Sequence, residues 1–152
     1  MYQQLASLIC SLVFIVLLIN GGDGQEISDE CLGCICHASS GCNKNQGCTD
    51  GGVCGPFLLT WPFWADAGKL MIKGSNPTNA YSDCSNDLYC AAESVRSYAR
   101  KYAKDCNQDG IIDCEDFARI HKNGPGACGD LQLLQTEYYQ KFAQCKAKVN
   151  PQ

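Results

Sequence analysis

The chain has 152 residues and a formal net charge of −4, from 12 Lys and Arg against 16 Asp and Glu. Its charges are dispersed, and no run of basic side chains is present to hold a polyanion. Because nucleic acids and anionic membranes are bound through clustered positive charge, we expect neither as a partner of the mature protein. Such a length suits one domain with a single core.

An apolar run from Leu5 to Ile19 lies near the N-terminus and is followed by the polar and small residues Asn20, Gly21 and Gly22. The run is long enough for the centre of a signal peptide and shorter than the ~18–20 residues that span a bilayer. It predicts a signal peptide over residues 1–24 and a secreted, extracellular domain over residues 25–152. A retained membrane anchor is the alternative.

Of the 13 cysteines, Cys10 lies in the predicted signal peptide, so an even number remains. An even number in an oxidising compartment predicts disulfides, here six, in preference to zinc, for which no second ligand pair follows. Short separations suggest three local pairs, Cys36–Cys42, Cys48–Cys54 and Cys84–Cys90. The pairing of the other six stays open, namely Cys31, Cys34, Cys106, Cys114, Cys128 and Cys145.

The first part of the predicted domain is rich in turn residues. Glycines and cysteines from Cys31 to Leu59 indicate loops and a short hairpin. Thr60 is placed to cap a brief helix that Gly68 ends. A polar turn is expected over residues 76–79.

Apolar residues at helical spacing predict three longer helices in the second part. We expect them from Ser85 or Asn86 to Tyr102, from Asp113 to His121 with Gly124-Pro125 closing the helix, and from Asp130 to Cys145. The predicted fold class is α+β, mostly helical with a small β-hairpin lobe, and disulfide-rich.

Four segments carry a family resemblance, namely CLGCICHASSGC from Cys31, CGPFLLTWPFWADAGK from Cys54, SDCSNDLYCAA from Ser82 and DFARIHKNGPGAC from Asp116. Together they resemble the invertebrate-type lysozymes, also called the destabilase family. The resemblance implies a lysozyme-like fold with a cleft between its lobes. It also implies that bacterial cell-wall peptidoglycan, a β-1,4 glycan, is the partner. We expect a monomer with an antibacterial, immune or digestive role.

One catalytic position departs from the family pattern. In active members a glutamate precedes the Ser-Gly that reads Ser40-Gly41 here, and that position is Ser39. A serine hydroxyl is too weak an acid to protonate a glycosidic oxygen, and loss of a general acid costs roughly 10²–10⁴-fold in rate. The resemblance suggests Asp50 as nucleophile or oxocarbenium stabiliser, although Asp50-Gly51 is also a strong turn dipeptide. Muramidase activity is therefore expected to be weak or lost.

Three functions remain open, namely a weak muramidase, a non-catalytic peptidoglycan-recognition module, and an isopeptidase of the destabilase kind. Trp61 and Trp64 are candidates to stack on sugar rings, or else to pack between the lobes. His121 is a candidate substrate-binding residue, with a structural hydrogen bond as the alternative. His37 is near two serines in sequence, but no group that would orient it is evident, so an exposed histidine is expected.

Residues 105–116 read DCNQDGIIDCED, which matches the twelve-residue calcium loop of EF-hands. The ligand positions are held by Asp105, Asn107, Asp109, Ile111 and Asp116. An Asp at the last position and two cysteines inside the loop depart from the pattern. A polar turn in which Asp113 caps the next helix is the alternative. No cofactor is expected to be required, and calcium is the candidate ion.

Overall fold

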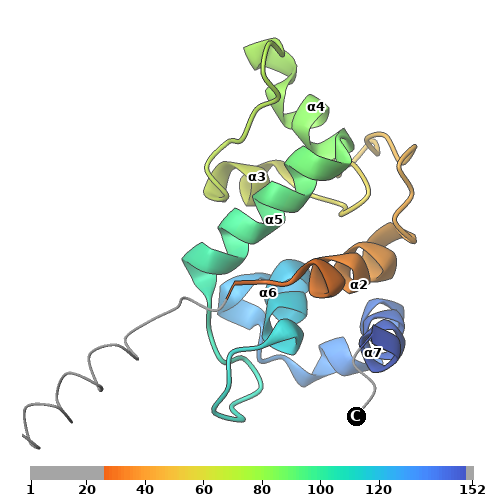
Figure 1. Ribbon diagram of the computed structural model, residues 1–152, viewed down its shortest axis with the longest axis vertical. Helices are drawn as coiled ribbons and strands as arrows, with labels where there is room; N and C mark the ends of the chain where they lie inside the picture. Colours follow the sequence, from red (N-terminus) through yellow and green to blue (C-terminus); the bar gives the residue numbers. More distant parts are fainter. Residues whose placement is uncertain (1–25, 150–152) are drawn as a thin grey trace, which may run out of the picture.

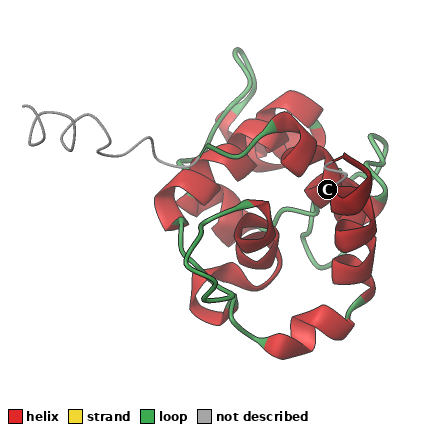
Figure 2. Cartoon of the chain, turned by 60° about the horizontal axis from the view of Figure 1, so that its bottom comes forward, coloured by secondary structure: helices red, strands yellow, loops and turns green. Residues whose placement is uncertain are grey.

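The computed structural model describes residues 26–149, so the predicted signal peptide lies outside the described part of the chain. Helices joined by loops make up this part (Figure 1; Figure 2). Within it, no helix is long and apolar enough to cross a membrane. The mostly helical character predicted from the sequence is confirmed.

The first helix, α2 (Asp29–Ser40), corrects the prediction of loops from Cys31 onward. The Oγ of Ser28 accepts a hydrogen bond from the Cys31 N–H at 3.2 Å, and Gly41 ends the helix in the left-handed conformation at φ 70°. Cysteines occupy much of the buried face, where aliphatic residues are more usual, and this composition hid the helical period. The buried residues are Cys31, Leu32, Cys34, Ile35, Cys36 and Ala38.

The segment from 41 to 59 connects α2 to α3 and forms the small lobe. It contains two isolated antiparallel bridges, Cys48 to Cys54 and Cys54 to Leu59. Tyr81 fixes this lobe to the helices, because its hydroxyl lies 2.6 Å from the Gly52 carbonyl oxygen and 2.7 Å from that of Leu59. The predicted hairpin therefore consists of these two backbone bridges, and the Tyr81 side chain attaches it to the helices.

The brief helix predicted after Thr60 is confirmed as α3 (Trp61–Asp66), and Thr60 Oγ1 accepts from the Phe63 N–H. The polar turn is a short 3-10 helix, η1 (Pro77–Asn79). The next predicted helix is divided in two, α4 (Ala80–Asn86) and α5 (Leu88–Tyr102). The division falls at Asp87, whose extended backbone and carboxylate cap α5.

The last two predicted helices differ from the prediction in one kink and one split. α6 (Cys114–Ala127) begins after Asp113 as predicted and is kinked at Gly124, where φ is 71°. The final one is split into a 3-10 helix, η2 (Leu131–Gln135), and α7 (Glu137–Val149). The split falls at Thr136, whose Oγ1 accepts from the Tyr139 N–H at 3.2 Å and so starts a new helix.

All twelve cysteines of the described residues are paired, and the three predicted local disulfides are confirmed. The long-range pairs are Cys31–Cys114, Cys34–Cys145 and Cys106–Cys128. Two of these tie α2 to α6 and α7, against which it packs (Figure 1). Buried side chains from α2, α5, α6 and α7 share one core cluster, which fixes the position of the end of α2.

Candidate functional site: a cleft beside Ser39

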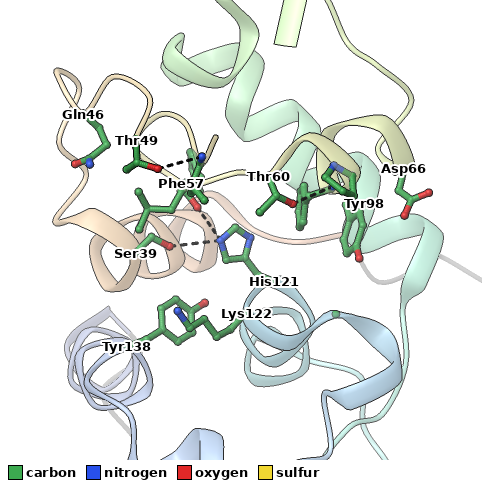
Figure 3. A pocket seen from close by; sticks show the side chains of 15 residues that line it. Ser39, Gln46, Thr49, Phe57, Thr60, Asp66, Tyr98, His121, Lys122 and Tyr138 are labelled. Carbon is green, nitrogen blue, oxygen red and sulfur yellow. Dashed lines mark hydrogen bonds between the residues drawn. The ribbon is translucent and has the colours of Figure 1, made fainter. Parts of the chain in front are cut away.

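A cleft of about 640 Å³ lies where the end of α2, the small lobe and the helices meet. Ser39 of α2 and His121 of α6 lie next to each other in its wall, with Phe57 of the small lobe beside them (Figure 3). Aromatic rings of Phe63, Tyr98 and Tyr138 supply much of the apolar wall. The site therefore collects side chains from six segments of the chain, namely α2, the small lobe, α3, α5, α6 and α7.

His121 is held by a backbone hydrogen bond in the wall of the cleft. Its Nε2 lies 2.9 Å from the carbonyl oxygen of Phe57, and because a carbonyl only accepts, Nε2 carries the proton. The other ring nitrogen, Nδ1, is buried and has no partner among the described residues. Burial lowers the pKa of His121 from 6.5 to about 4. The ring is therefore neutral at pH 7.

Ser39 lies in the last turn of α2, half-buried at the edge of the cleft. Its hydroxyl donates to the carbonyl oxygen of Ile35 at 2.8 Å, while its Oγ lies 3.4 Å from Nε2 of His121. Since that nitrogen carries a proton, it has no lone pair with which to activate the serine. The neighbouring Ser40 donates to the Pro56 carbonyl oxygen at 2.6 Å. Neither serine is arranged as a nucleophile.

Carboxylates are scarce around Ser39. Asp66 is the one carboxylate on the cleft wall among the described residues, and it lies 3.4 Å from the Lys101 ammonium. Asp50 is exposed in the turn after Thr49 and is not part of the cleft wall. Glycoside hydrolysis needs two carboxyl groups facing one bond, about 5–5.5 Å apart in retaining enzymes. The described residues present no such pair in the cleft.

The two tryptophans have different environments, and neither is in the cleft wall. Trp64 is buried, and its indole N–H donates to the Leu70 carbonyl oxygen at 2.8 Å. Both observations are typical of a tryptophan with a structural role. Trp61 is 52% exposed, with the Lys69 ammonium 5.6 Å from its ring centroid. Sugar stacking by either residue stays a prediction.

The carboxylates of the 105–116 loop contact backbone N–H groups. Asp116 is fully buried and accepts from the N–H groups of Cys106 at 2.7 Å and Asp113 at 2.9 Å. Asp105 accepts from Gly110, and Asp109 from Ile111. No group of three or more His, Cys, Asp or Glu in residues 26–149 is arranged to hold a metal ion. Calcium at this loop stays a prediction from the motif alone.

The sequence model of a family described as Destabilase matches residues 28–145. The chain belongs to the destabilase family. An invertebrate-type lysozyme of Ruditapes philippinarum is 36% identical over 124 residues, which cover 79% of this chain and 85% of the relative. Invertebrate-type lysozyme 3 of Caenorhabditis elegans is 37% identical over 122 residues, 78% of this chain and 84% of the relative.

Solved structures agree with the sequence relatives. The crystal structure of Tapes japonica lysozyme matches with a TM-score of 0.61 and 32% identity, over 76% of this chain and 88% of that one. Meretrix lusoria lysozyme in complex with Aeromonas hydrophila PliI matches with a TM-score of 0.61 and 31% identity, over 78% and 89%. The lysozyme-like fold expected from the resemblance is confirmed.

Several residues of this destabilase-family cleft were missed by sequence reasoning. Tyr138 fits the apolar pattern of the last predicted helix, which gives no signal of a cleft, and it is both buried and part of the cleft wall. Lys122 directly follows the segment ARIH, but a single lysine carries no signal in a sequence. Its position beside Ser39 depends on the packing of α6 against α2.

Proposed function

We propose that this chain is a secreted protein that binds bacterial wall glycan in the cleft and has lost most or all muramidase activity. The observation that carries the proposal is Ser39, which holds a hydroxyl in the cleft where active members carry their acid. No carboxylate of the described residues takes its place, since Asp66 is paired with Lys101. The named relatives are lysozymes, which supports peptidoglycan as the ligand.

Secretion and a monomeric state form part of the same proposal. Six disulfides join residues as far as 111 positions apart, and such pairing persists in oxidising compartments outside the cytosol. The signal peptide over residues 1–24 would direct the chain there. Purification from culture medium with a new N-terminus near Gln25, and a mass in solution equal to one chain, are the expected results.

Two assays on the secreted protein test the function. Pull-down on insoluble peptidoglycan should retain the protein, whereas turbidity of a Gram-positive wall suspension should fall no faster than in buffer. A destabilase-family relative with the intact glutamate serves as the positive control. Robust lysis by the unmodified protein would show that another group acts as the acid, and absence from the pellet would remove the binding function.

The isopeptidase alternative rests on the family resemblance. It needs a serine activated by a base, and the nearest candidate pair, Ser39 and His121, presents a protonated nitrogen to the hydroxyl. We therefore expect no cleavage of a γ-glutamyl-lysine chromogenic peptide. Release of the chromophore, abolished by Ser39→Ala, would restore this alternative.

A further inference from the structure

Lys122 carries the one charge on the cleft wall that is in no ion pair within the described residues. Asp66 at one end of the cleft pairs with Lys101 at 3.4 Å. In the adjoining hollow, Glu137 pairs with Lys141 at 2.8 Å. His121 is neutral at pH 7 because it is enclosed. The electrostatic field felt by a ligand in the cleft is therefore set largely by the Lys122 ammonium.

The position of Lys122 connects two hollows. It lines both the main cleft and a neighbouring hollow of about 320 Å³, and Ser39 and Tyr138 are the other residues common to both. Its ammonium lies 5.4 Å from the ring centroid of Tyr138, a ring that attracts a cation on its face. Tyr138 is itself fixed, because its hydroxyl donates to the Ala118 carbonyl oxygen at 3.1 Å. The Lys122 ammonium thus lies over the Tyr138 ring, in the same hollow as Ser39 (Figure 3).

A cation at this point opposes glycoside cleavage and favours an anionic ligand. The transition state of cleavage is oxocarbenium-like and positive, so an ammonium raises its energy, whereas a carboxylate lowers it. The same ammonium attracts a carboxylate on a bound sugar chain. The serine in place of an acid at position 39 and the positive charge of Lys122 therefore both disfavour hydrolysis, and the charge favours binding of an anionic ligand.

We propose that the cleft selects β-1,4 glycans that bear carboxylates, and that Lys122 is the residue that determines this preference. The inference rests on the proposed glycan-binding function and adds the residue that distinguishes carboxylate-bearing glycans from neutral ones. The carboxylate is supplied either by the lactyl group of an N-acetylmuramic acid or by a peptide attached to it. Neutral glycans of the same linkage bind in the same cleft but more weakly.

Three tetrasaccharides of equal length separate these sources in calorimetric titrations of the full mature protein. The first is neutral chitotetraose, the second alternates N-acetylglucosamine with N-acetylmuramic acid and has free lactyl carboxylates, and the third carries peptides on those lactyl groups. We expect the second or the third to bind about fivefold more tightly than the first at low salt, the effect of one charge pair at about 4 Å in water. The preference should shrink in 0.5 M salt.

Variants assign the preference to one side chain. Lys122→Gln should bind all three tetrasaccharides as the wild type binds chitotetraose, and Lys122→Arg should keep the preference. Lys148→Gln, which removes an exposed lysine from the far end of α7, is the matched control and should behave as the wild type. Circular dichroism spectra verify that each variant is folded.

The outcomes separate the two proposals. Equal affinity of the wild type for all three ligands, or a preference that survives in Lys122→Gln, overturns the role of Lys122 and leaves glycan binding in place. Binding of none of the three overturns the glycan-binding function and this inference with it. A preference for the second ligand over the third assigns the contact to the lactyl carboxylate, and the reverse order to the peptide.

Discussion

Ser39 Oγ lies 3.4 Å from Nε2 of His121, yet the proton of that nitrogen is directed to the Phe57 carbonyl oxygen 2.9 Å away. The two residues therefore resemble a serine–base pair in distance and differ from one in protonation. A general base needs a free lone pair facing the hydroxyl, and the only unprotonated nitrogen, Nδ1, is buried on the opposite side of the ring. The hydrogen bond from His121 to Phe57 joins α6 to the small lobe, and Ser39 of α2 lies against the same ring nitrogen.

The effect of Lys122 on an acid at position 39 can be measured in a pair of variants. Ser39→Glu restores a carboxyl group, but the nearby ammonium should lower its pKa, whereas a general acid needs a raised one. We expect Ser39→Glu/Lys122→Gln to lyse wall suspensions about tenfold faster than Ser39→Glu, since one pKa unit changes the protonated fraction about tenfold near neutral pH. Equal initial rates of turbidity loss would contradict this reason.

The buried ring of His121 predicts an acid-sensitive fold. The unfolded chain protonates this histidine near pH 6.5, whereas the folded protein resists protonation until about pH 4. The contribution of His121 to the free energy of unfolding is therefore fully present above pH 6.5. It falls by up to about 1.4 kcal/mol per pH unit as the pH is lowered from 6.5 to 4. Urea unfolding with intact disulfides should show a shallower fall in His121→Gln. The exposed His37 is the control, and His37→Gln should keep the wild-type slope.

The two types of disulfide should contribute unequally to stability. Cys34–Cys145 closes a loop of 111 positions and Cys84–Cys90 one of six. In the chain-entropy description the long loop is worth about 4–5 kcal/mol and the short one about 2 kcal/mol. Denaturant unfolding of the double variants Cys34→Ala/Cys145→Ala and Cys84→Ala/Cys90→Ala should reproduce this order. A larger loss from the short loop would show that native packing, and not chain entropy, sets the values.

Asp116 should be among the most sensitive polar residues outside the cleft. Its fully buried carboxylate accepts from the N–H groups of Cys106 and Asp113, and Asp116→Ala leaves these donors without a partner. We expect a loss of about 2–4 kcal/mol in urea unfolding, and a smaller one in Asp116→Asn, which keeps one oxygen. The exposed cap Asp130 is the comparison, and Asp130→Ala should cost about 1 kcal/mol or less.

The loop around Asp116 should keep its shape without calcium. The Cys106–Cys128 disulfide and the contacts of Asp116 already fix its ends, so we expect the circular dichroism spectra in EDTA and in millimolar calcium to agree. If calcium binds the folded loop, the Tm rises by mass action whether or not the loop changes shape. A rise of several degrees that is lost in Asp109→Ala would establish the calcium site that the motif predicts.

Local features of the fold could be predicted from the sequence because they depend on neighbouring residues. Thr60 and Asp113 cap their helices as expected, since a capping side chain bonds to an N–H two or three positions away. Cys36–Cys42 and the other six-residue loops followed from short separations. The prediction for α2 was wrong for a related reason, because cysteines that form its buried face were taken as a mark of irregular backbone.

The family, the serine at position 39 and the local disulfides were predictable from the sequence alone, because each depends on residue identity or short spacing. The surroundings of Ser39 became known only from the packed structure. His121 is 82 positions away, and its neighbour Lys122 lines the same hollow as Ser39 only because α6 packs against α2. The protonation of His121 likewise depends on enclosure by Phe57 and Tyr138. Such long-range contacts follow from the packing of the whole core, which no local pattern encodes.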